Sequence, residues 1–533
     1  MKERSVRGQV ALLLAGIFFA LACRKEANRP TWDVDVVVPL IKTTLTIGDL
    51  VPDTLLSIDQ QGNVSILYSN QLFALKLDTV LTAPDTSFSY IYPVPFNIPN
   101  VAPGTTFSNT NDVTRFALDQ LELRDLRIRS GSLSMMISNS ISGNILGHFA
   151  LPGATLDGSP FVIDQTVLAG TQTAPTLINS TRALDGYHFD LRGPQFNDVN
   201  TLATQISYTT DPDGPSIGLL AGDSLKAVVN YQDIVPAYAK GYFGTRSIVI
   251  APDSTIIDLF ENINGLLDLD HVTAQLKVRN GIGVDARADI HYLRSVNTRT
   301  GAVVDLDHSI ITNPLNLDRA LDLGNSFQEA HNNYTLINSN SNIDLFLENL
   351  PDRIAYSLDV IIDPLGDVSN GNDFLYYEST LSADLEVEIP LRVIATDLSL
   401  QKTTAVDLGG TAEHHAIQSG TLHVFATNGF PFSAALRLDI VNAQGHVLSA
   451  LPPVGTIASA SVNAAAIVQS STESELSVAV NKEQVDMLYN GGQLRITATF
   501  NTASQTQHVQ LLSDHKLFLQ VTAEGNYIVN GNE

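Results

Sequence analysis

One stretch of this sequence occurs twice, and the repetition constrains the fold more than any other feature. IRSGSLSMMISNSI covers residues 128–141, and IQSGTLHVFATNGF covers residues 417–430. The two copies align without a gap and share an Ile-x-Ser-Gly start, an inward Leu and a late Asn. Because their starts lie 289 positions apart, the repeated unit is not one of the short repeats that build a solenoid.

Further partial copies indicate how long the repeated unit is. NGIGVDARADI begins at Asn280 and matches NGFPFSAALRL, which begins at Asn428. Asn139, Asn280 and Asn428 are therefore 141 and 148 positions apart, which predicts modules of domain length. Two shorter matches support this. TLINS occurs at 176–180 and at 335–339, and the pattern D-[VL]-[DE]-V-x-[VI]-P-L occurs at 33–40 and at 384–391.

Each copy has the composition of a strand that ends in a reversal. We expect a Ser-Gly turn, a strand with Leu on its inward side, and a tight turn or bulge at the Asn. Asn and Gly both tolerate positive φ, so Asn139, Asn280 and Asn428 are predicted to be conformational residues. The alternative is that these asparagines bind a ligand.

Alternation of apolar and polar residues dominates the chain, as half-buried strands require. In DLEVEIPL (384–391), RIAYSLDVII (353–362) and QLRITATF (493–500), every second residue is apolar. Helices are expected to be few and short. The two best candidates are SNIDLFLENL, capped by Ser341, and NKEQVDMLYNGG, ending at Gly491.

The N-terminus has the features of an export signal. Lys2, Arg4 and Arg7 precede a short apolar run, Val10–Ala22, which is too short to span a bilayer. The run ends at Cys23, the single cysteine of the 533 residues. We predict a lipoprotein signal peptide over 1–22, lipidation of Cys23 and a tether over 23–32, with an ordinary signal peptide as the alternative.

Composition excludes some classes of partner. The net charge of −26 argues against nucleic acid and against docking on anionic lipid, because both require basic surfaces. Only 16% of residues are charged, so Ser, Thr, Asn and Gln must form much of the surface. With one cysteine the chain can form no intramolecular disulfide. In an oxidising compartment, core packing alone must therefore stabilise the fold.

The N-terminal segment and the strand rhythm carry a resemblance to known proteins. LAC at 21–23 resembles a bacterial lipobox, although Ala20 stands where that motif usually has Leu, and Lys25-Glu26 resembles the surface-export signal of Bacteroidota lipoproteins. The strand, Asn turn and short-helix rhythm of 33–533 resembles tubular lipid-binding (TULIP, BPI-like) proteins. That resemblance implies a curled sheet around an apolar ligand, but the long amphipathic helix of that family is absent.

These observations predict a mainly β protein of two or three pseudo-repeated antiparallel modules, each a curled sheet or a β-sandwich, with a few short helices. The predicted modules cover residues 33–245, 246–400 and 401–533.

GDSL at 222–225 resembles the nucleophile block of the SGNH hydrolases, with Ser224 as the nucleophile. That resemblance also implies an Asp-x-x-His pair, for which Asp305 and His308 are the candidates. However, DLDH precedes GND at 371–373, the reverse of the family's order, and the parallel βαβ pattern is missing. A turn that opens a strand explains GDSL more simply, and we expect the protein not to be an enzyme.

Metal ligands are sparse in this sequence. The weak calcium candidates are Asp367, Asp373 and Glu378, in a loop whose Gly lies one position from where an EF-hand needs it. A solvated hairpin loop is the simpler interpretation. His414 and His415 are adjacent, so in a strand they point to opposite faces and cannot chelate one ion. No cofactor is expected.

The sequence therefore favours a non-enzymatic binding or scaffolding lipoprotein. It would be anchored in the outer membrane by the acylated N-terminus, facing the periplasm or lying on the cell surface. Its partner would be an apolar or lipid ligand or a surface protein. The alternative is a glycan-binding module, for which Tyr376 and Tyr377 are candidate sugar platforms because Trp32 lies in the tether.

Overall fold

The computed structural model describes residues 31–76, 84–406, 408, 410–411, 414–415 and 417–530. The predicted signal peptide, Cys23 and the Lys25-Glu26 pair lie outside these residues. The described chain is built of antiparallel strands with three short α-helices, which confirms the mainly β prediction.

The chain folds into two compact units that are both discontinuous in sequence. Among the described residues, one unit contains 31–64, Asn262–Asp270 and 391–530, and the other contains Ser65–Glu261 and His271–Pro390. We call the first unit module C. The sheets of the second unit form module A, over residues 84–243, and module B, from the rest of that unit.

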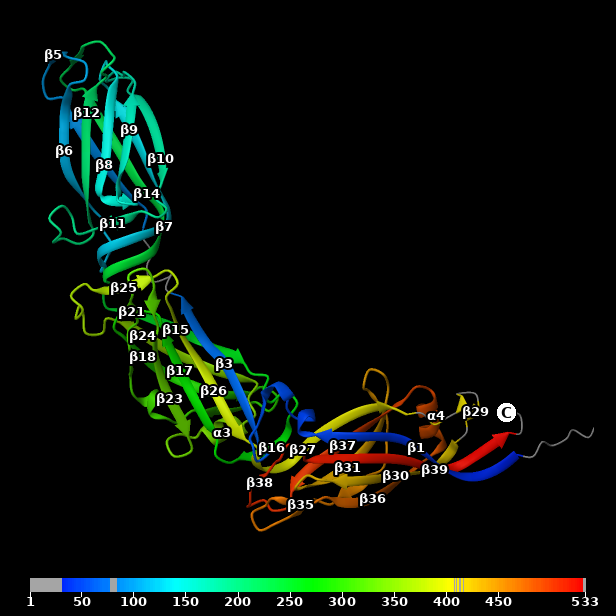
Figure 1. Ribbon diagram of the computed structural model, residues 1–533. Helices are drawn as coiled ribbons and strands as arrows, with labels where there is room; N and C mark the ends of the chain where they lie inside the picture. Colours follow the sequence, from blue (N-terminus) through cyan, green and yellow to red (C-terminus); the bar gives the residue numbers. More distant parts are fainter. Residues whose placement is uncertain are drawn as a thin grey trace, which may run out of the picture. The chain divides into compact units, whose positions relative to one another are not determined.

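The main strands of module A form one continuous sheet with two halves. One half has the order β4-β14-β7-β10 and the other β6-β12-β8-β9, and β11 joins them because it pairs with both β7 and β8. Figure 1 shows β6, β12, β8 and β9 side by side. The strands are β4 (Thr86–Pro93), β5 (Ile98–Val101), β6 (Thr106–Arg115), β7 (Glu122–Asn139), β8 (Ile145–Leu156), β9 (Ser159–Val167), β10 (Thr176–Ala183), β11 (His188–Asp190), β12 (Thr201–Thr210), β13 (Ile217–Leu219) and β14 (Ser224–Tyr242).

Module B is a sandwich of β3-β26-β17-β23 against β15-β24-β18-β19. Its strand β25 pairs with β14 of module A. The elements are β3 (Val64–Lys76), β15 (Arg246–Ile256), β17 (Thr273–Asn280), β18 (Ala286–Asn297), β19 (Ala302–Asp305), α2 (Ser309–Thr312), β20 (Leu315–Leu317), β21 (Leu321–Asp322), β22 (Phe327–Gln328), β23 (Ala330–Ile337), α3 (Ile343–Glu348), β24 (Arg353–Ile362), β25 (Asp373–Tyr376) and β26 (Thr380–Pro390).

Module C repeats this plan with β1-β39-β30-β36 and β16-β27-β37-β31-β32. Its elements are β1 (Thr31–Thr46), η1 (Ile47–Asp49), η2 (Asp53–Leu55), β2 (Leu56–Ile58), β16 (Asn264–Leu269), β27 (Arg392–Ala405), β28 (Gly410–Thr411), β29 (His414–His415), β30 (Ile417–Asn428), β31 (Phe432–Val441), β32 (Val447–Ala450), β33 (Gly455–Ile457), β34 (Ser461–Val462), β35 (Val468–Ser470), β36 (Thr472–Val480), α4 (Lys482–Tyr489), β37 (Gln493–Thr502), β38 (Val509–Gln510) and β39 (Lys516–Asn530).

The three modules share one topology and are inserted into one another along the sequence. In each, the strand that ends in the repeated Asn lies between the last strand of the module and a later edge strand, and the next strand starts the second sheet, or in module A the second half of the sheet. Module A interrupts module B between β3 and β15. Module C is interrupted twice, between β2 and β16 and again between β16 and β27. The contiguous boundaries predicted at 245/246 and 400/401 therefore do not match the structure. The nesting depends on strands that pair across hundreds of residues, and such pairing produces no local signal in the sequence.

The repeated Asn ends a strand in each module and is fully buried. In module A, Asn139 Nδ2 donates to the carbonyl oxygens of Gly143 and Leu168, at 3.1 and 2.9 Å. Its Oδ1 accepts from the Ile141 amide at 2.8 Å. One side chain thus ties the end of β7, the start of the next strand and a distant loop together.

Asn280 and Asn428 repeat this arrangement. The Asn428 bonds reach Phe432 O, Ala458 O and Phe430 N, and the Asn280 bonds reach Asp318 O and Ile282 N. The asparagines are conformational, as predicted, but the predicted reason is wrong. None of the three has a positive φ, and each acts through its side-chain hydrogen bonds.

The Ser-Gly pair does not form the predicted turn at the start of each copy. Gly131 lies within β7, and Gly420 lies within β30. A Cβ on Gly420 would lie 2.0 Å from the Glu524 carbonyl oxygen, so the glycine permits close approach of two backbones. In module B, β17 begins at Thr273, past the equivalent position, which explains why the copy at Asn280 is partial.

The predicted cores and helices are present. The inward residues of the three alternating segments are buried, as in Leu385, Val360 and Ile496. Helix α4 begins at the Asn481 capping box, and Gly491 follows it with a φ of 88°. Asn342, rather than the predicted Ser341, occupies the N-cap position of helix α3, and its side chain makes no capping hydrogen bond.

Candidate functional site

An open groove of about 660 Å³ lies on module A, at the outer face of β6, β12 and β8 and beside β11. The loop from 191 to 200 forms its remaining side. The groove has the volume of a small-molecule site. It is lined by Asn111, Asp112, Val113, Pro152, Gly153, Thr155, His188, Asp190, Gly193, Pro194, Phe196, Ala203, Thr204 and Gln205.

The 191–200 loop is fixed at its base by Asn200. Asn200 Oδ1 accepts from the Leu123 amide at 2.7 Å, and its Nδ2 donates to Leu121 O at 2.6 Å. The backbone amide of Asn200 donates to Leu123 O at 2.9 Å. Within the loop, the Phe196 amide donates to Gly193 O at 3.2 Å. These bonds preform the loop before any ligand arrives.

Phe196 is the most unusual residue of the groove. Its side chain is 64% exposed, and its φ is 59°, in the left-handed region that bulky residues rarely adopt. The Arg192 guanidinium lies 5.2 Å from the centre of its ring. An exposed aromatic ring held at a cost in backbone energy is typical of a binding residue.

Arg192 also orients a carboxylate of the groove. Its Nε and Nη2 donate to the two oxygens of Asp190, at 2.9 and 2.7 Å. This pairing lowers the pKa of Asp190 and fixes the carboxylate as a hydrogen-bond acceptor.

His188 forms a second oriented pair. Its Nε2 lies 2.8 Å from Asp125 Oδ2 on β7. The hydrogen bond to Asp125 raises the pKa of His188, while partial burial opposes that shift. The imidazole is 42% exposed, so it is both anchored and open to a ligand.

A chain of buried hydroxyl groups holds the strands under the groove. Tyr90 Oη lies 2.6 Å from Thr114 Oγ1, which lies 2.7 Å from Thr204 Oγ1. Thr114 and Thr204 are each 1% exposed, so these bonds join β6 to β12 inside the core. The groove therefore stands on a rigid sheet, as binding sites require.

The chemistry of this lining suits an uncharged polar ligand. Asn111, Gln205 and Thr155 supply neutral donors and acceptors, and Phe196 and Pro194 supply apolar surface. Among the described residues, no group of three or more His, Cys, Asp or Glu side chains is placed to hold a metal ion.

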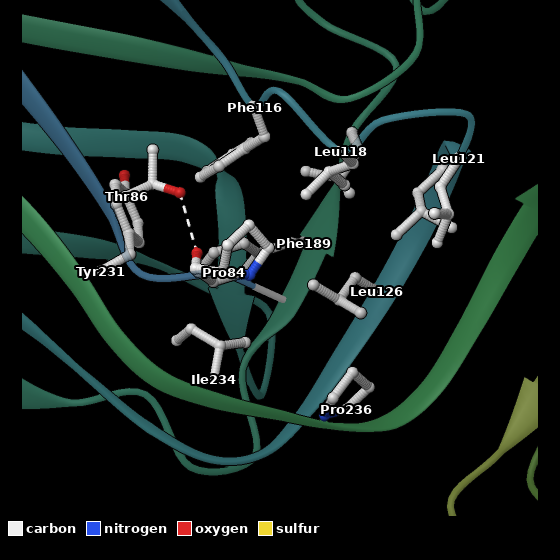
Figure 2. A pocket seen from close by; sticks show the side chains of 12 residues that line it. Pro84, Thr86, Phe116, Leu118, Leu121, Leu126, Phe189, Tyr231, Ile234 and Pro236 are labelled. Carbon is white, nitrogen blue, oxygen red and sulfur yellow. Dashed lines mark hydrogen bonds between the residues drawn. The ribbon is translucent and has the colours of Figure 1, made fainter. Parts of the chain in front are cut away.

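The apolar cavities found in the described residues are much smaller than this groove. One lies in module A between Phe116, Leu126 and Tyr231, and Figure 2 shows how Leu118, Leu121 and the prolines converge on it. Another lies in module B, lined by Leu276 and Leu358 among others. Each measures about 40 Å³, enough for water but far too small for an acyl chain.

The predicted hydrolase residues are not brought together into a triad. Ser224 is the first residue of β14 in module A, and its amide donates to Ser140 Oγ at 2.7 Å. Asp305 ends β19 of module B and pairs with Arg294, and His308 caps α2. GDSL forms a turn with Gly222 at a φ of 92°, followed by a strand.

The calcium candidates are occupied by other partners. Asp373 lies 2.7 Å from Arg319 Nη2, and Glu378 lies 3.0 Å from Arg129 Nη1. Asp367 Oδ1 accepts from the Gly371 amide at 2.7 Å. These contacts direct the three carboxylates to different neighbours.

Calcium is therefore expected to leave the melting temperature unchanged. Asp373 would have to give up its arginine before it could bind an ion. The measurement is a thermal melt with 5 mM Ca²⁺ or with EDTA, at roughly millimolar levels typical of extracellular calcium sites. A rise of several degrees with Ca²⁺ would contradict this assignment.

The predicted sugar platforms do not line the groove. Tyr376 is 8% exposed, and its hydroxyl donates to Asp322 at 2.9 Å. Tyr377 is exposed, and the Arg129 guanidinium carbon lies 4.0 Å from its ring centre. Trp32 lies in β1 rather than in a tether, and its side chain is outside the described positions, as are those of His414 and His415.

Phe196 was missed because periodicity says nothing about a loop residue. The available signal was LRGPQFNDVN at 191–200, where Gly, Pro, Asn and Asp predict turns around a single aromatic residue. His188 and Asp125 lie 63 positions apart, and only strand pairing between β11 and β7 brings them together.

Comparisons with known proteins identify no family. No family model matches this chain, and no curated protein matches it. A crystal structure named "a putative secreted protein from Parabacteroides distasonis ATCC 8503" covers 93% of this chain and 100% of that chain, at 9% identity and a TM-score of 0.29. The structure of the infectious bursal disease virus Gx strain covers 91% and 87%, at 9% identity and a TM-score of 0.12.

Likenesses at these TM-scores carry no argument about function. In the described part of the chain, no helix has the length and apolar character needed to cross a membrane.

Proposed function

We propose that this protein is a non-enzymatic binding protein of the cell exterior, and that the groove of module A binds a neutral saccharide. The observation that carries the proposal is Phe196, an exposed ring held in a strained conformation at the edge of a polar groove. Sugars present apolar C–H faces beside hydroxyl groups, so a ring next to amide and carboxylate groups matches their chemistry.

The charges of the groove favour a neutral ligand over an acidic one. Asp112 and Asp190 line the groove, and Arg192 is engaged by Asp190. A carboxylate or sulfate group on the sugar would meet these aspartates without a free guanidinium to pair with.

A lipid anchor at Cys23 completes the proposal. Export and acylation would place the modules outside the inner membrane, on the periplasmic face or on the cell surface. A surface protein is the alternative partner. The cavities of about 40 Å³ do not support binding of an apolar ligand in the way that the groove supports binding of a saccharide.

Phe196→Ala is expected to weaken saccharide binding by at least tenfold, because the Phe196 ring can no longer stack against the apolar face of the sugar. Binding is measured by isothermal titration calorimetry against neutral oligosaccharides of glucose, galactose, mannose and xylose. Phe96→Ala is the matched control, since Phe96 is also in module A and is 63% exposed but does not line the groove.

Equal affinity of Phe196→Ala and the unmodified protein would reject the groove as the site. Binding of acidic oligosaccharides in preference to the neutral ones would reject the proposed ligand class.

A further inference from the structure

The lining of the groove includes a titratable side chain that is hydrogen-bonded to the protein and also exposed to solvent. His188 lies on β11, between β7 and β8, and lines the groove together with Asp190. Because an ionised carboxylate only accepts hydrogen bonds, the bond to Asp125 assigns the Nε2 proton to His188. Nδ1 is then the ring nitrogen available to a ligand.

The charged groups around His188 come from two strands. Asp125 and Arg127 lie on β7, and Asp190 lies on β11 itself. On β8, the residue paired with His188 is the uncharged Thr155. The two aspartates favour the imidazolium and Arg127 opposes it, so the pKa of His188 is raised above its ordinary value, with the Asp125 hydrogen bond as the largest cause.

The Arg127 side chain makes its hydrogen bonds with residues that do not line the groove. Its Nη1 donates to Gly324 O at 2.8 Å and to Asn325 Oδ1 at 3.1 Å. Its guanidinium carbon lies 4.8 Å from the centre of the Tyr238 ring. The neighbouring cation is thus committed to other partners, while the imidazole stays 42% exposed.

We infer that His188 binds the saccharide directly through Nδ1 and makes the affinity of the groove depend on pH, with tighter binding when the imidazole is protonated. The inference rests on the proposed function. Neutral Nδ1 can only accept a hydrogen bond from a sugar hydroxyl, whereas the imidazolium donates a charge-assisted bond to the hydroxyl oxygen. Such a bond is roughly twice as strong as a neutral one.

The test is the dissociation constant of the best-binding neutral oligosaccharide of the panel, measured from pH 5 to pH 8. The unmodified protein is expected to bind about fivefold more tightly at pH 5 than at pH 8. His188→Gln is expected to bind with the weaker affinity at every pH, because the amide does not titrate. Asp125→Asn is expected to move the midpoint to lower pH, because the carboxylate that favours the imidazolium is lost.

His148→Gln is the matched control. His148 lies on β8 of the same module, and its Nδ1 lies 2.7 Å from Asp164 Oδ1, but it does not line the groove. This variant is expected to keep the pH profile of the unmodified protein. Circular dichroism checks that each variant is folded.

The outcomes separate the inference from the proposed function. An affinity that depends on Phe196 but does not change with pH, or a pH profile that survives His188→Gln, overturns the role of His188 and leaves saccharide binding intact. Absence of binding to the whole panel by the unmodified protein overturns both.

Discussion

Asn139→Ala is expected to destabilise module A by about 3 kcal/mol, because the substitution leaves buried backbone groups without partners. Asn139 is fully buried, and its side chain satisfies the carbonyl oxygens of Gly143 and Leu168 and the amide of Ile141. Alanine can replace none of these three bonds. The loss should concentrate where β7 ends and β8 begins.

Hydrogen–deuterium exchange measures this loss locally. Peptides that cover the end of β7 and the loop at Leu168 should exchange about a hundredfold faster, which corresponds to about 3 kcal/mol. The control is Asn109→Ala, since Asn109 is an exposed residue of β6 in the same module. Equal protection in the two variants would show that the buried bonds of Asn139 contribute little.

Asp363→Asn is expected to stabilise the protein above neutral pH and to remove one group's contribution to the pH dependence of its stability. Asp363 is 1% exposed, and neither carboxylate oxygen has a hydrogen-bond partner among the described residues. Burial, followed by the nearby charges of Asp373 and Asp285, raises its pKa to about 7. The folded protein therefore holds a proton that the unfolded chain releases near the ordinary aspartate pKa of 3.8.

The direction of the effect follows from proton linkage. Between pH 4 and pH 7 the folded state binds more protons than the unfolded state, so stability is greatest below about pH 4 and is lost as the pH rises through about 7. The full loss is on the order of 4 kcal/mol. Asn cannot ionise, so the advantage of the variant should grow from pH 4 to pH 8.

Urea unfolding at pH 4, 6 and 8, followed by circular dichroism, measures this difference. Asp213→Asn removes the same charge from an exposed position and serves as the control. A variant no more stable than the unmodified protein at pH 8 would mean that the ionised carboxylate is stabilised by the protein after all.

Local patterns in the sequence predicted local structure well. The alternation in DLEVEIPL and QLRITATF identifies the buried faces of β26 and β37, because a strand exposes every second residue to one side. The Asn repeats predicted two or three related modules. Their nesting could not be predicted, because the pairing of Thr31 with Asn530 depends on tertiary contacts between opposite ends of the chain.

The site illustrates the same limit. Ser224 and Asp367 matched short motifs and Tyr376 was a candidate sugar platform, but the three residues belong to a turn, to a loop and to a buried hydrogen bond with Asp322. Phe196 belongs to no motif. Its importance depends on its φ, its exposure and the strands around it, which appear only once the chain has folded.

The nested order of the modules has a mechanical consequence. The chain passes twice between modules A and B, and it passes four times between modules B and C, at 64/65, 261/262, 270/271 and 390/391. A force applied to module A would therefore be shared between two chain segments at its junction with module B and among four at the junction of modules B and C. A protease that cuts one of these segments would not release the module, because the second segment still tethers it.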